Sequence, residues 1–523
     1  MAKYDINNLS LDQKIGQLLM FGFDALELND HAIDLIKNYS FGNVILFTRN
    51  CKSMEQLFNL NKNLQKLALK TIGIPLLISI DQEGGMVTRL KNGGTYFPGA
   101  MTLASSNNSN NAYLSGKYMG RELISLGFNM DLAPVLDVNN NPNNPVIGVR
   151  SFSSSPSVVS EYGIKFMEGL QESVIATAKH FPGHGDTNAD SHLQLPLISH
   201  NKERLDKIEL YPFKKAIDKG VKAIMSAHIN FPAYTENNLP TTLSKKCLTG
   251  LLREKLQFEG LIMTDCMEMK AIQDNYTTEG GSLMSIQAGA NLVCLSHTKY
   301  YQLEAFKKIK EAVLSGGLSL NTLNERVSRV LKYKEELDLS ILNSEYKEID
   351  KIVENEDTKA FSYQVVKEAV TLIRGKSFLK KDKTLIMAVR PSVTTIVDEE
   401  AGSFDIITEV KKLLKDFDTL DIHVKPTPKK IKEALLKAED YDQVVVCTYN
   451  ANIYHSQLEL VNELKQLNVE LNVMAMRNPY DFIDDETIEN YVCFYEYTPN
   501  SVKALIEYLK GDLVPRKRVI LNE

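Results

Sequence analysis

Short runs of apolar, often β-branched residues alternate with longer helical stretches between about residues 10 and 335. This alternation is typical of βαβ units, in which parallel strands lie buried between helices. A strand buried on both faces is a continuous apolar run. The runs of this kind are Asn43 to Phe47, Pro75 to Ile80, Phe128 to Leu132, Val174 to Ala178, Ala223 to Met225, Leu261 to Met263 and Asn291 to Leu295. Their number favours an (α/β)8 TIM-type barrel over an open sheet, with one strand irregular or missing.

A second α/β pattern follows a polar, poorly periodic stretch. We therefore predict a barrel domain over residues 1–335, a linker over 336–360 and an α/β sandwich domain over 361–523. The strands expected in the sandwich are Thr384 to Val389, Val444 to Cys447 and Val473 to Met476, with helices at Lys429 to Ala438 and Ser456 to Leu467. No catalytic motif is recognisable in this second region.

Composition narrows the class of protein. With 43% hydrophobic and 24% charged residues over 523 positions, the chain resembles soluble globular proteins and not disordered or fibrous ones. The formal charge of −6 is small for this length, and no Lys/Arg cluster is interleaved with aromatic residues. We therefore expect no nucleic-acid partner.

The sequence also predicts a cytoplasmic protein without membrane association. The N-terminal Met-Ala-Lys-Tyr-Asp-Ile-Asn-Asn is polar, and no run approaches the roughly 18 apolar residues that would span a bilayer. The cysteines form no CxxC pair, which is typical of a reducing compartment. We expect all of them to be buried thiols, at Cys51, Cys247, Cys266, Cys294, Cys447 and Cys493.

Polar side chains directly follow several of the predicted barrel strands. Asp81, Lys179, His180, His228 and Asp265 each come at or just after the end of an apolar run. In a parallel barrel these carboxyl ends meet on one face, where residues far apart in sequence can surround one ligand. Taken singly, each could cap a helix or solvate a loop. Together they predict an active site.

The segment Lys179-His-Phe-Pro-Gly-His-Gly-Asp-Thr-Asn-Ala-Asp-Ser-His192 carries the densest set of reactive side chains. Pro and Gly exclude a helix here and predict a mobile loop, so that His192 reaches its position when substrate binds. Asp190 and His192 lie two residues apart, which places both side chains on one side of an extended backbone. An aspartate in contact with a histidine fixes its tautomer and stabilises its charged form, which suits proton transfer near neutral pH.

Three other interpretations of this loop stay open. A zinc site could use His180, His184 and His192 with Asp186 or Asp190, although the spacing matches none of the common zinc signatures. His184, flanked by glycines, could instead shape the loop through backbone hydrogen bonds. The histidines could also be entirely structural.

Asp265 suits the role of nucleophile. It follows an apolar strand and precedes an expected helix, so its carboxylate should be fixed at the mouth of the barrel. A carboxylate that attacks an anomeric carbon forms a glycosyl-enzyme intermediate, and a second group must protonate the departing oxygen. His192 could supply that proton. Asp265 as a helix N-cap and Glu268 as the nucleophile remain alternatives.

Asp81 and Arg150 are candidates for holding a sugar. Asp81 opens Asp81-Gln-Glu-Gly-Gly85, where the glycines let the backbone approach a ligand closely and the carboxylate can bind neighbouring hydroxyls. Glu83 in the same segment could instead be the acid or the nucleophile. Arg150, in Asn144-Pro-Val-Ile-Gly-Val-Arg-Ser-Phe152, offers a rigid fork of donors, unless it forms only an exposed salt bridge.

Together these segments resemble glycoside hydrolase family 3, in particular its β-N-acetylglucosaminidase (β-N-acetylhexosaminidase) branch. The resemblance extends from about Leu11 to Leu331, and Lys-His-Phe-Pro-Gly-His-Gly followed by Asp-Ser-His is specific to that branch. It implies a retaining exo-β-N-acetylglucosaminidase without metal or cofactor. It also implies Asp265 as nucleophile, the Asp190–His192 dyad as general acid/base, and sugar contacts from Asp81, Arg150, Lys179 and His180.

The branch serves peptidoglycan recycling, so the resemblance implies an amino-sugar oligosaccharide substrate of muropeptide or chitin type. The second region resembles the α/β sandwich of two-domain members. One residue departs from the branch, which commonly has Arg where this chain has Met86, and we expect this to affect packing or an outer subsite. The alternatives left open are an N-acetylglucosaminide phosphorylase, a β-glucosidase, and a non-catalytic amino-sugar-binding protein.

Overall fold

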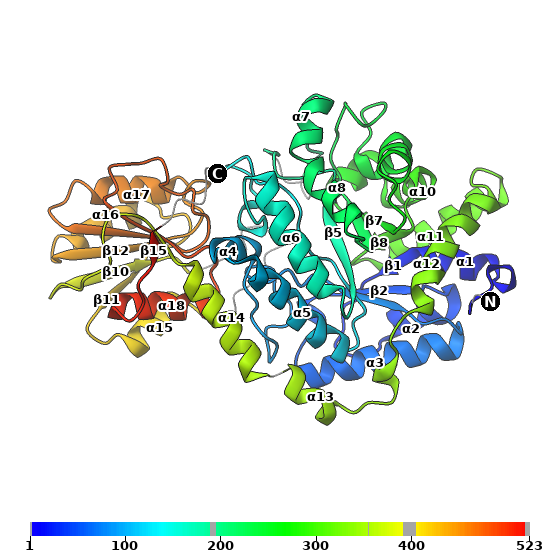
Figure 1. The fold of residues 1–523 in the computed structure, drawn as a ribbon, viewed down its shortest axis with the longest axis horizontal. Coiled ribbons are helices and arrows are strands. Elements are labelled where there is room, and N and C mark those ends of the chain that lie inside the picture. The colour runs from blue at the N-terminus through cyan, green and yellow to red at the C-terminus, as the bar shows by residue number, and fades with distance from the viewer. Residues whose placement is uncertain (1–2, 189–194, 354, 391–403, 518–523) are drawn as a thin grey trace.

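The computed structural model describes residues 3–188, 195–353, 355–390 and 404–517, and its chain forms two α/β units (Figure 1). The first is a closed barrel of eight strands in chain order, and the second is a seven-stranded sheet. The predicted fold class, a TIM-type barrel followed by an α/β sandwich, is confirmed. The proposed Asp190–His192 dyad lies outside the described residues.

The barrel strands pair in parallel around the whole circle, β1 with β2 and onward until β8 closes on β1. Their bounds are β1 Leu19–Phe21, β2 Asn43–Leu46, β3 Leu77–Ile80, β4 Met130–Asp131, β5 Ile175–Phe181, β6 Ala223–Ser226, β7 Leu261–Cys266 and β8 Leu292–Leu295. Every predicted run contains one of β2 to β8 or overlaps it. The strand missing from the prediction is β1, because it continues directly from a helix and has only three residues.

Helices surround the barrel. They are α1 Leu11–Leu18, α2 Asp30–Tyr39, α3 Met54–Thr71, α4 Ala100–Ser105, α5 Ser109–Ser125, α6 Pro156–Leu170, α7 Lys202–Lys207, α8 Leu210–Asp218, the π-helix η5 Lys246–Lys255, α9 Lys270–Tyr276, α10 Thr278–Ala288, α11 Lys299–Leu314 and α12 Leu320–Glu335. Local sequence fixes several starts. Ser10 and Gln13 form a reciprocal capping box that begins α1, and Pro156 is the first residue of α6.

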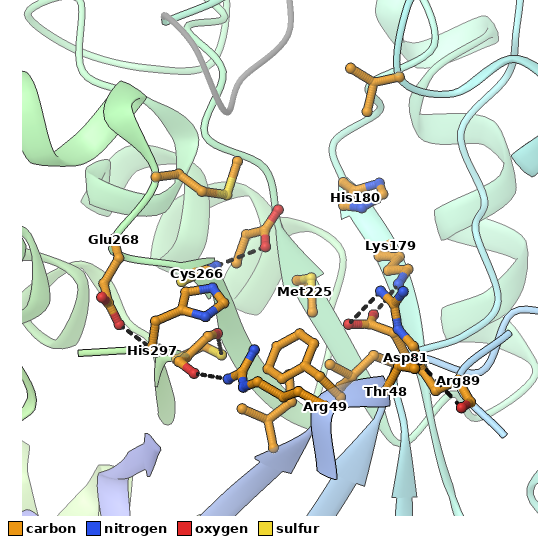
Figure 2. A pocket seen from close by; sticks show the side chains of 18 of the residues that line it. Thr48, Arg49, Asp81, Arg89, Lys179, His180, Met225, Cys266, Glu268 and His297 are labelled. Atoms are coloured by element: carbon orange, nitrogen blue, oxygen red, sulfur yellow. Dashed lines mark hydrogen bonds and ion pairs between the residues drawn. The ribbon is translucent and has the colours of Figure 1, made fainter. Parts of the chain in front are cut away.

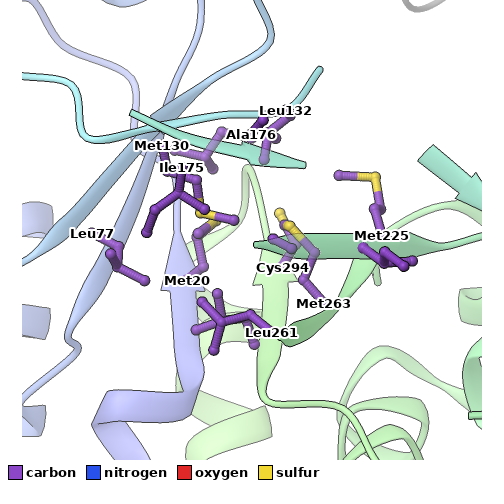
Figure 3. Packing of buried hydrophobic residues seen from close by; sticks show 14 of the residues in the cluster. Met20, Leu77, Met130, Leu132, Ile175, Ala176, Met225, Leu261, Met263 and Cys294 are labelled. Carbon is purple, nitrogen blue, oxygen red and sulfur yellow. The ribbon is translucent and has the colours of Figure 1, made fainter. Parts of the chain in front are cut away.

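The interior of the barrel is packed with side chains (Figure 3). Met20, Met130, Leu261 and Met263 meet there with no exposed surface. Unbranched methionines adapt to the uneven gaps left between converging strands. Because the interior is filled, a ligand can enter only at an end of the barrel.

The second unit has the strand order β11-β10-β12-β13-β14-β9-β15, parallel except where β9 meets β14. Its strands are β9 Thr371–Arg374, β10 Thr384–Ala388, β11 Asp418–Asp421, β12 Gln443–Thr448, β13 Glu470–Ala475, β14 Asn490–Cys493 and β15 Arg516–Lys517, and its helices are α15 Ile406–Leu413, α16 Pro428–Ala438, α17 Ser456–Leu464 and α18 Pro499–Lys510. The predicted strands correspond to β10, β12 and β13. The prediction missed β9, β11, β14 and β15. Of these, β11 has the sequence Asp-Thr-Leu-Asp, which contains no apolar run.

Residues 336–360, predicted to be a linker, contain η6 Ser340–Leu342, α13 Tyr346–Val353 and the start of α14 Glu356–Ala369. Helix α14 runs between the two units (Figure 1). Its Val365 packs in the core of the barrel unit, whereas the next residue, Val366, packs in the core of the second unit. The position of the domain boundary stays a prediction.

Two further sequence expectations concern membranes and cysteines. Among the described residues, no helix is both long and apolar enough to cross a membrane. The six cysteines are free thiols, and five of them are buried as expected. The exception is Cys266, which is half-buried at the end of β7.

Candidate active site

A cavity of about 800 Å³ opens at the carboxyl ends of the barrel strands. This volume lies within the range of small-molecule sites. Figure 2 shows Asp81, Lys179 and His180 on one wall, and Cys266 and Glu268 on the opposite wall. The residues predicted to do chemistry that also line the cavity are Asp81, Arg150, Lys179, His180, His184, Asp265 and the alternative nucleophile Glu268.

One wall is built on a buried network of charges. Lys179, in β5, donates from Nζ to Asp81 Oδ1 at 2.7 Å and lies 2.7 Å from Glu83 Oε1. Arg150 Nε and Nη2 donate to the two oxygens of Glu83 at 2.9 and 2.7 Å. Arg150, Lys179 and Glu83 are all buried, so the alternative of an exposed salt bridge for Arg150 is wrong. The network fixes four side chains from three separate segments.

Charge pairing decides the protonation of this network. Burial by itself would raise the pKa of Glu83, but the charges of Arg150 and Lys179 hold it well below its usual range. Burial likewise opposes the charged form of Lys179, yet Asp81 and Glu83 raise the pKa of Lys179 above its usual value. Glu83 therefore stays ionised and has no proton to donate near neutral pH. It also does not line the cavity, which argues against Glu83 as acid or nucleophile.

Asp137 holds the start of the histidine loop, and the sequence analysis missed it. Its Oδ1 accepts the backbone N–H of His180 at 3.1 Å and of His184 at 2.7 Å, and its Oδ2 lies 2.6 Å from His180 Nδ1. Burial alone would raise the pKa of Asp137, but His180 and the amide donors lower it. The sequence did hold a signal, because Asp137 is a lone charge within the apolar stretch from Leu132 to Val138 and needed a buried partner.

His184 shapes the loop, as one of the sequence alternatives held. Its Nδ1 lies 2.9 Å from Thr187 Oγ1, and its carbonyl accepts from Asn144 Nδ2 at 2.8 Å. Burial lowers the pKa of His184 to about 4, so its ring is neutral at physiological pH. Within the described residues, no group of three or more His, Cys, Asp or Glu side chains could hold a metal ion.

Asp265 lies at the end of β7, on the wall opposite the charge network. Its Oδ1 accepts from the N–H of Cys266 at 2.7 Å. The following helix, α9, begins at Lys270 with Met269 as its N-cap, so the N-cap interpretation of Asp265 is wrong. Its carboxylate instead borders the cavity.

Glu268, the alternative nucleophile, has a structural role. Its Oε1 accepts from the backbone N–H of His297 at 2.7 Å and of Thr298 at 3.2 Å. These bonds tie the loop after β7 to the loop after β8. Asp265 and Glu268 both border the cavity, but the Glu268 carboxylate is committed to two backbone donors, which makes it the weaker nucleophile.

His228, which also follows a barrel strand, contacts the end of β7 outside the cavity. It is buried, its Nε2 lies 3.0 Å from the carbonyl of Cys266, and its Nδ1 lies 2.9 Å from Thr242 Oγ1. It does not line the cavity. His228 therefore steadies the strand end that carries Asp265.

The remaining lining residues include aromatic and cationic groups that the sequence analysis did not identify. Arg49 lies 4.3 Å from the centre of the Phe47 ring and donates from Nη2 to the carbonyl of Ser296 at 2.7 Å. The rings of Phe47 and His297 stack with centroids 5.5 Å apart. Phe47 follows β2 directly, so apolar as well as polar side chains at the strand ends line the cavity.

Comparison with known proteins agrees with this geometry. The family model described as the glycosyl hydrolase family 3 N terminal domain matches residues 10–333. Beta-hexosaminidase A of Pseudoalteromonas piscicida is 34% identical over 381 residues, which cover 64% of this chain and 64% of that protein, just under two thirds of its length. A beta-hexosaminidase of Nitrosomonas eutropha is 37% identical over 261 residues, covering 49% of this chain and 73% of that protein.

A solved structure is similar over almost the entire chain. It is a glycoside hydrolase family 3 beta-N-acetylglucosaminidase from Paenibacillus sp. str. FPU-7, with a TM-score of 0.90 and 37% sequence identity. The similarity covers 98% of this chain and 99% of that chain. Both the barrel and the second unit therefore have counterparts in that structure.

The charge network predicts a large effect of Glu83→Gln on stability. Removing one member of a buried ion pair leaves uncompensated charge, so we expect a loss of about 3–5 kcal/mol in the free energy of unfolding, measured with urea. The exposed pair of Lys165 and Glu168 provides a control. Glu168→Gln should change the same free energy by less than about 1 kcal/mol, and equal losses in both variants would contradict the buried network.

The same variant gives a pH test. Because the pKa of Glu83 is lowered in the folded state, its ionised form stabilises the fold above the unfolded pKa of about 4.3. That stability is lost as pH falls from there toward the folded-state pKa. The difference between wild type and Glu83→Gln should therefore be constant near neutral pH and shrink below about pH 4.

Proposed function

The chain belongs to glycosyl hydrolase family 3, and from that premise we propose that it is a retaining exo-β-N-acetylglucosaminidase. The observation that carries the proposal is the arrangement of the cavity. Asp265 borders it from the end of β7, opposite the buried network that fixes Asp81. A sugar held by one wall would present its anomeric carbon to the other, as a retaining mechanism requires.

The proposed reaction has two steps that share one nucleophile. The Asp265 carboxylate attacks the anomeric carbon, the bond from that carbon to the leaving oxygen breaks, and His192 gives that oxygen its proton. In the second step a water molecule gives a proton to His192, its oxygen attacks the same carbon, and Asp265 leaves. Configuration is retained because two inversions occur in succession.

A histidine acid departs from the usual pair of carboxylates in such enzymes. Asp265 must be ionised to attack, and a second carboxylate close to it would repel that charge. A histidine is neutral or cationic, so it avoids this repulsion. Asp190 would hold the ring of His192 in one tautomer and stabilise its protonated form.

Asp81, Arg150, Lys179 and His180 are proposed to hold the sugar. Asp81 is oriented by Lys179 Nζ at 2.7 Å and by Arg89 Nη2 at 4.0 Å, which leaves a fixed carboxylate for neighbouring hydroxyls. The ring of His180 is held by Asp137. A site built from such restrained groups loses little conformational entropy when it binds.

We propose N-acetylglucosamine at the non-reducing end of a muropeptide or chitin-type oligosaccharide as the substrate, consistent with a cytoplasmic role in peptidoglycan recycling. The names of the similar proteins support an N-acetylhexosamine over glucose.

The substrate assignment predicts preferential release from a chromogenic N-acetyl-β-glucosaminide over the matching glucoside. The measurement compares kcat/KM for the two in buffer without phosphate, and then identifies the sugar formed when phosphate is added. Free N-acetylglucosamine under both conditions is expected. Faster cleavage of the glucoside would refute the assignment, and a sugar 1-phosphate would show phosphorolysis.

The proposed nucleophile predicts that Asp265→Ala lowers kcat by at least about 10⁴-fold. Azide should restore turnover of an activated aryl substrate and form the α-glycosyl azide, because it enters from the face that the carboxylate vacated. Asp274→Ala provides a matched control, since Asp274 is exposed on α9 and does not line the cavity. Retained turnover in Asp265→Ala would contradict the assignment.

The proposed acid predicts that the effect of His192→Ala depends on the leaving group. A poor leaving group needs protonation, so we expect about 10²- to 10⁴-fold loss of kcat/KM there and a much smaller loss with dinitrophenyl as leaving group. The half-exposed His200, paired with Asp186 at 2.6 Å, serves as the histidine control. Equal losses on both substrates would argue against a role as acid.

A further inference from the structure

The carboxyl edge of the second sheet faces the barrel. The first five strands of this sheet have the doubly wound order in which ligands usually bind at the carboxyl ends, beside the point where the chain reverses direction. Here the loops after β12 and β13 contact the barrel unit. Asn452 Nδ2 donates to the carbonyl of Pro142 at 2.7 Å, and Tyr480 OH accepts from Asn139 Nδ2 at 3.1 Å.

The residue that departs from the family pattern also lies at this interface. Met86 packs against the core of the second unit, and its Sδ accepts from the N–H of Tyr497 at 3.2 Å. Met101 and Val149 of the barrel unit are buried in that same core. Met86 therefore takes part in packing, at a contact between the two domains.

Glu496, just after β14, is a buried carboxylate at the interface between the two units. It is 1% exposed. Its Oε2 accepts from the N–H of Gly99 at 2.9 Å and from Thr102 Oγ1 at 2.6 Å, both in the barrel unit, and its Oε1 accepts from Thr498 Oγ1 at 2.7 Å. A buried carboxylate is tolerated only with such partners, so this contact depends on both units being docked.

Glu496 lies close to the turn that carries Glu83, a member of the charge network. A Cβ on Gly85 would lie 2.7 Å from Gly99 Cα and 3.4 Å from Glu496 Oε2, so the two backbones and the carboxylate are in close contact. Gly85 also donates to the carbonyl of Phe97 at 2.8 Å. Glu83 lies two residues earlier in the same turn. A cavity of about 10 Å³, the size of one water molecule, is lined by both Glu83 and Glu496.

Asn478, after β13, lies against Gly148, in the segment that carries Arg150 of the charge network. Gly148 begins the 3₁₀ helix η3 Gly148–Arg150, and its φ is +46°. A Cβ on Gly148 would lie 2.8 Å from Asn478 Oδ1, whose side chain supplies all three nearest atoms. The second unit therefore abuts the segment that carries Arg150.

We propose that the second domain is a positioning element for the sugar site: Glu496 and Asn478 hold the Glu83–Gly85 turn and the Gly148–Arg150 helix in register. Neither residue lines the large cavity, so both act through Glu83 and Arg150. The use of these groups for sugar binding rests on the proposed function. Loops of the barrel unit contact the carboxyl edge of the second sheet, where such sheets usually bind ligands, and in this proposal that contact serves to assemble the site.

The kinetic test compares Glu496→Ala and Glu496→Gln with Glu470→Ala in the full-length protein. Glu470 begins β13 at the opposite end of the same sheet and bonds to Lys381 and Gln443, so its variant measures destabilisation of the domain alone. We expect Glu496→Ala to raise KM for the aryl N-acetyl-β-glucosaminide about tenfold, with a smaller change in kcat. For scale, displacing a substrate-positioning group by about 1 Å lowers a reaction rate by up to about 100-fold. Glu496→Gln should recover part of the loss. A KM unchanged relative to Glu470→Ala would overturn the proposal.

A second readout does not depend on turnover. Amide hydrogen exchange at residues 84–87 and 148–150 should be faster in Glu496→Ala than in wild type and in Glu470→Ala. Unchanged exchange at both segments would overturn the positioning role whatever the substrate is. If the wild type released no sugar from any β-glycoside, the proposed function would fail, while the exchange result would still decide whether the domains are coupled.

A suppressor experiment tests the contact at Asn478. Gly148→Ala places a methyl group against Asn478 Oδ1 and should raise KM. Asn478→Ala in the same chain removes the obstruction, so the double variant should recover part of that increase, with the strain of the positive φ remaining. A double variant no better than Gly148→Ala would show that this contact does not set the position of Arg150.

Discussion

The cavity wall that we propose binds the sugar depends on one buried carboxylate shared between two cations. Glu83 comes from the loop after β3, Arg150 from η3 and Lys179 from β5, and none of them can be buried charged without the others. The three segments must therefore adopt their final positions together. This also removes Glu83 from the catalytic candidates, because its charge is needed to compensate the cations. Asp81, which is joined to the network through Lys179, is left as the carboxylate of this group that lines the cavity.

The two walls of the cavity are stabilised by different means. The wall of Asp81 is held by ion pairs, whereas Asp265 is carried by a strand end whose neighbouring carbonyl is supported by His228. On the wall of Asp265, Glu268 also joins the loops after β7 and β8 through backbone hydrogen bonds. Rigid elements thus supply both walls, which is the condition for precise placement of reacting groups.

The sequence predicted most of the barrel because two-sided burial leaves a local mark, a continuous apolar run. It missed β1, where helix α1 leads straight into three strand residues. In the second unit it missed β9, β11, β14 and β15, of which β11 is polar. For the site, polarity at strand ends identified Asp81, Lys179, His180 and Asp265. It could not assign roles to Asp137 or Glu83, because these depend on partners 43 and 67 residues away. A lone charge in an apolar stretch, such as Asp137, shows that a buried partner is needed, but the fold decides which residue supplies it.

The adjacent valines of α14 have a consequence for how the protein unfolds. Val365 belongs to one hydrophobic core and Val366 to the other, so a single turn of helix is buried on both sides. Melting either core would strip half of the apolar contacts from that turn and expose its backbone hydrogen bonds to water. Subglobal opening of one domain is therefore penalised by the other. The two domains should behave as one cooperative unit, and heat or denaturant would not release an intact barrel.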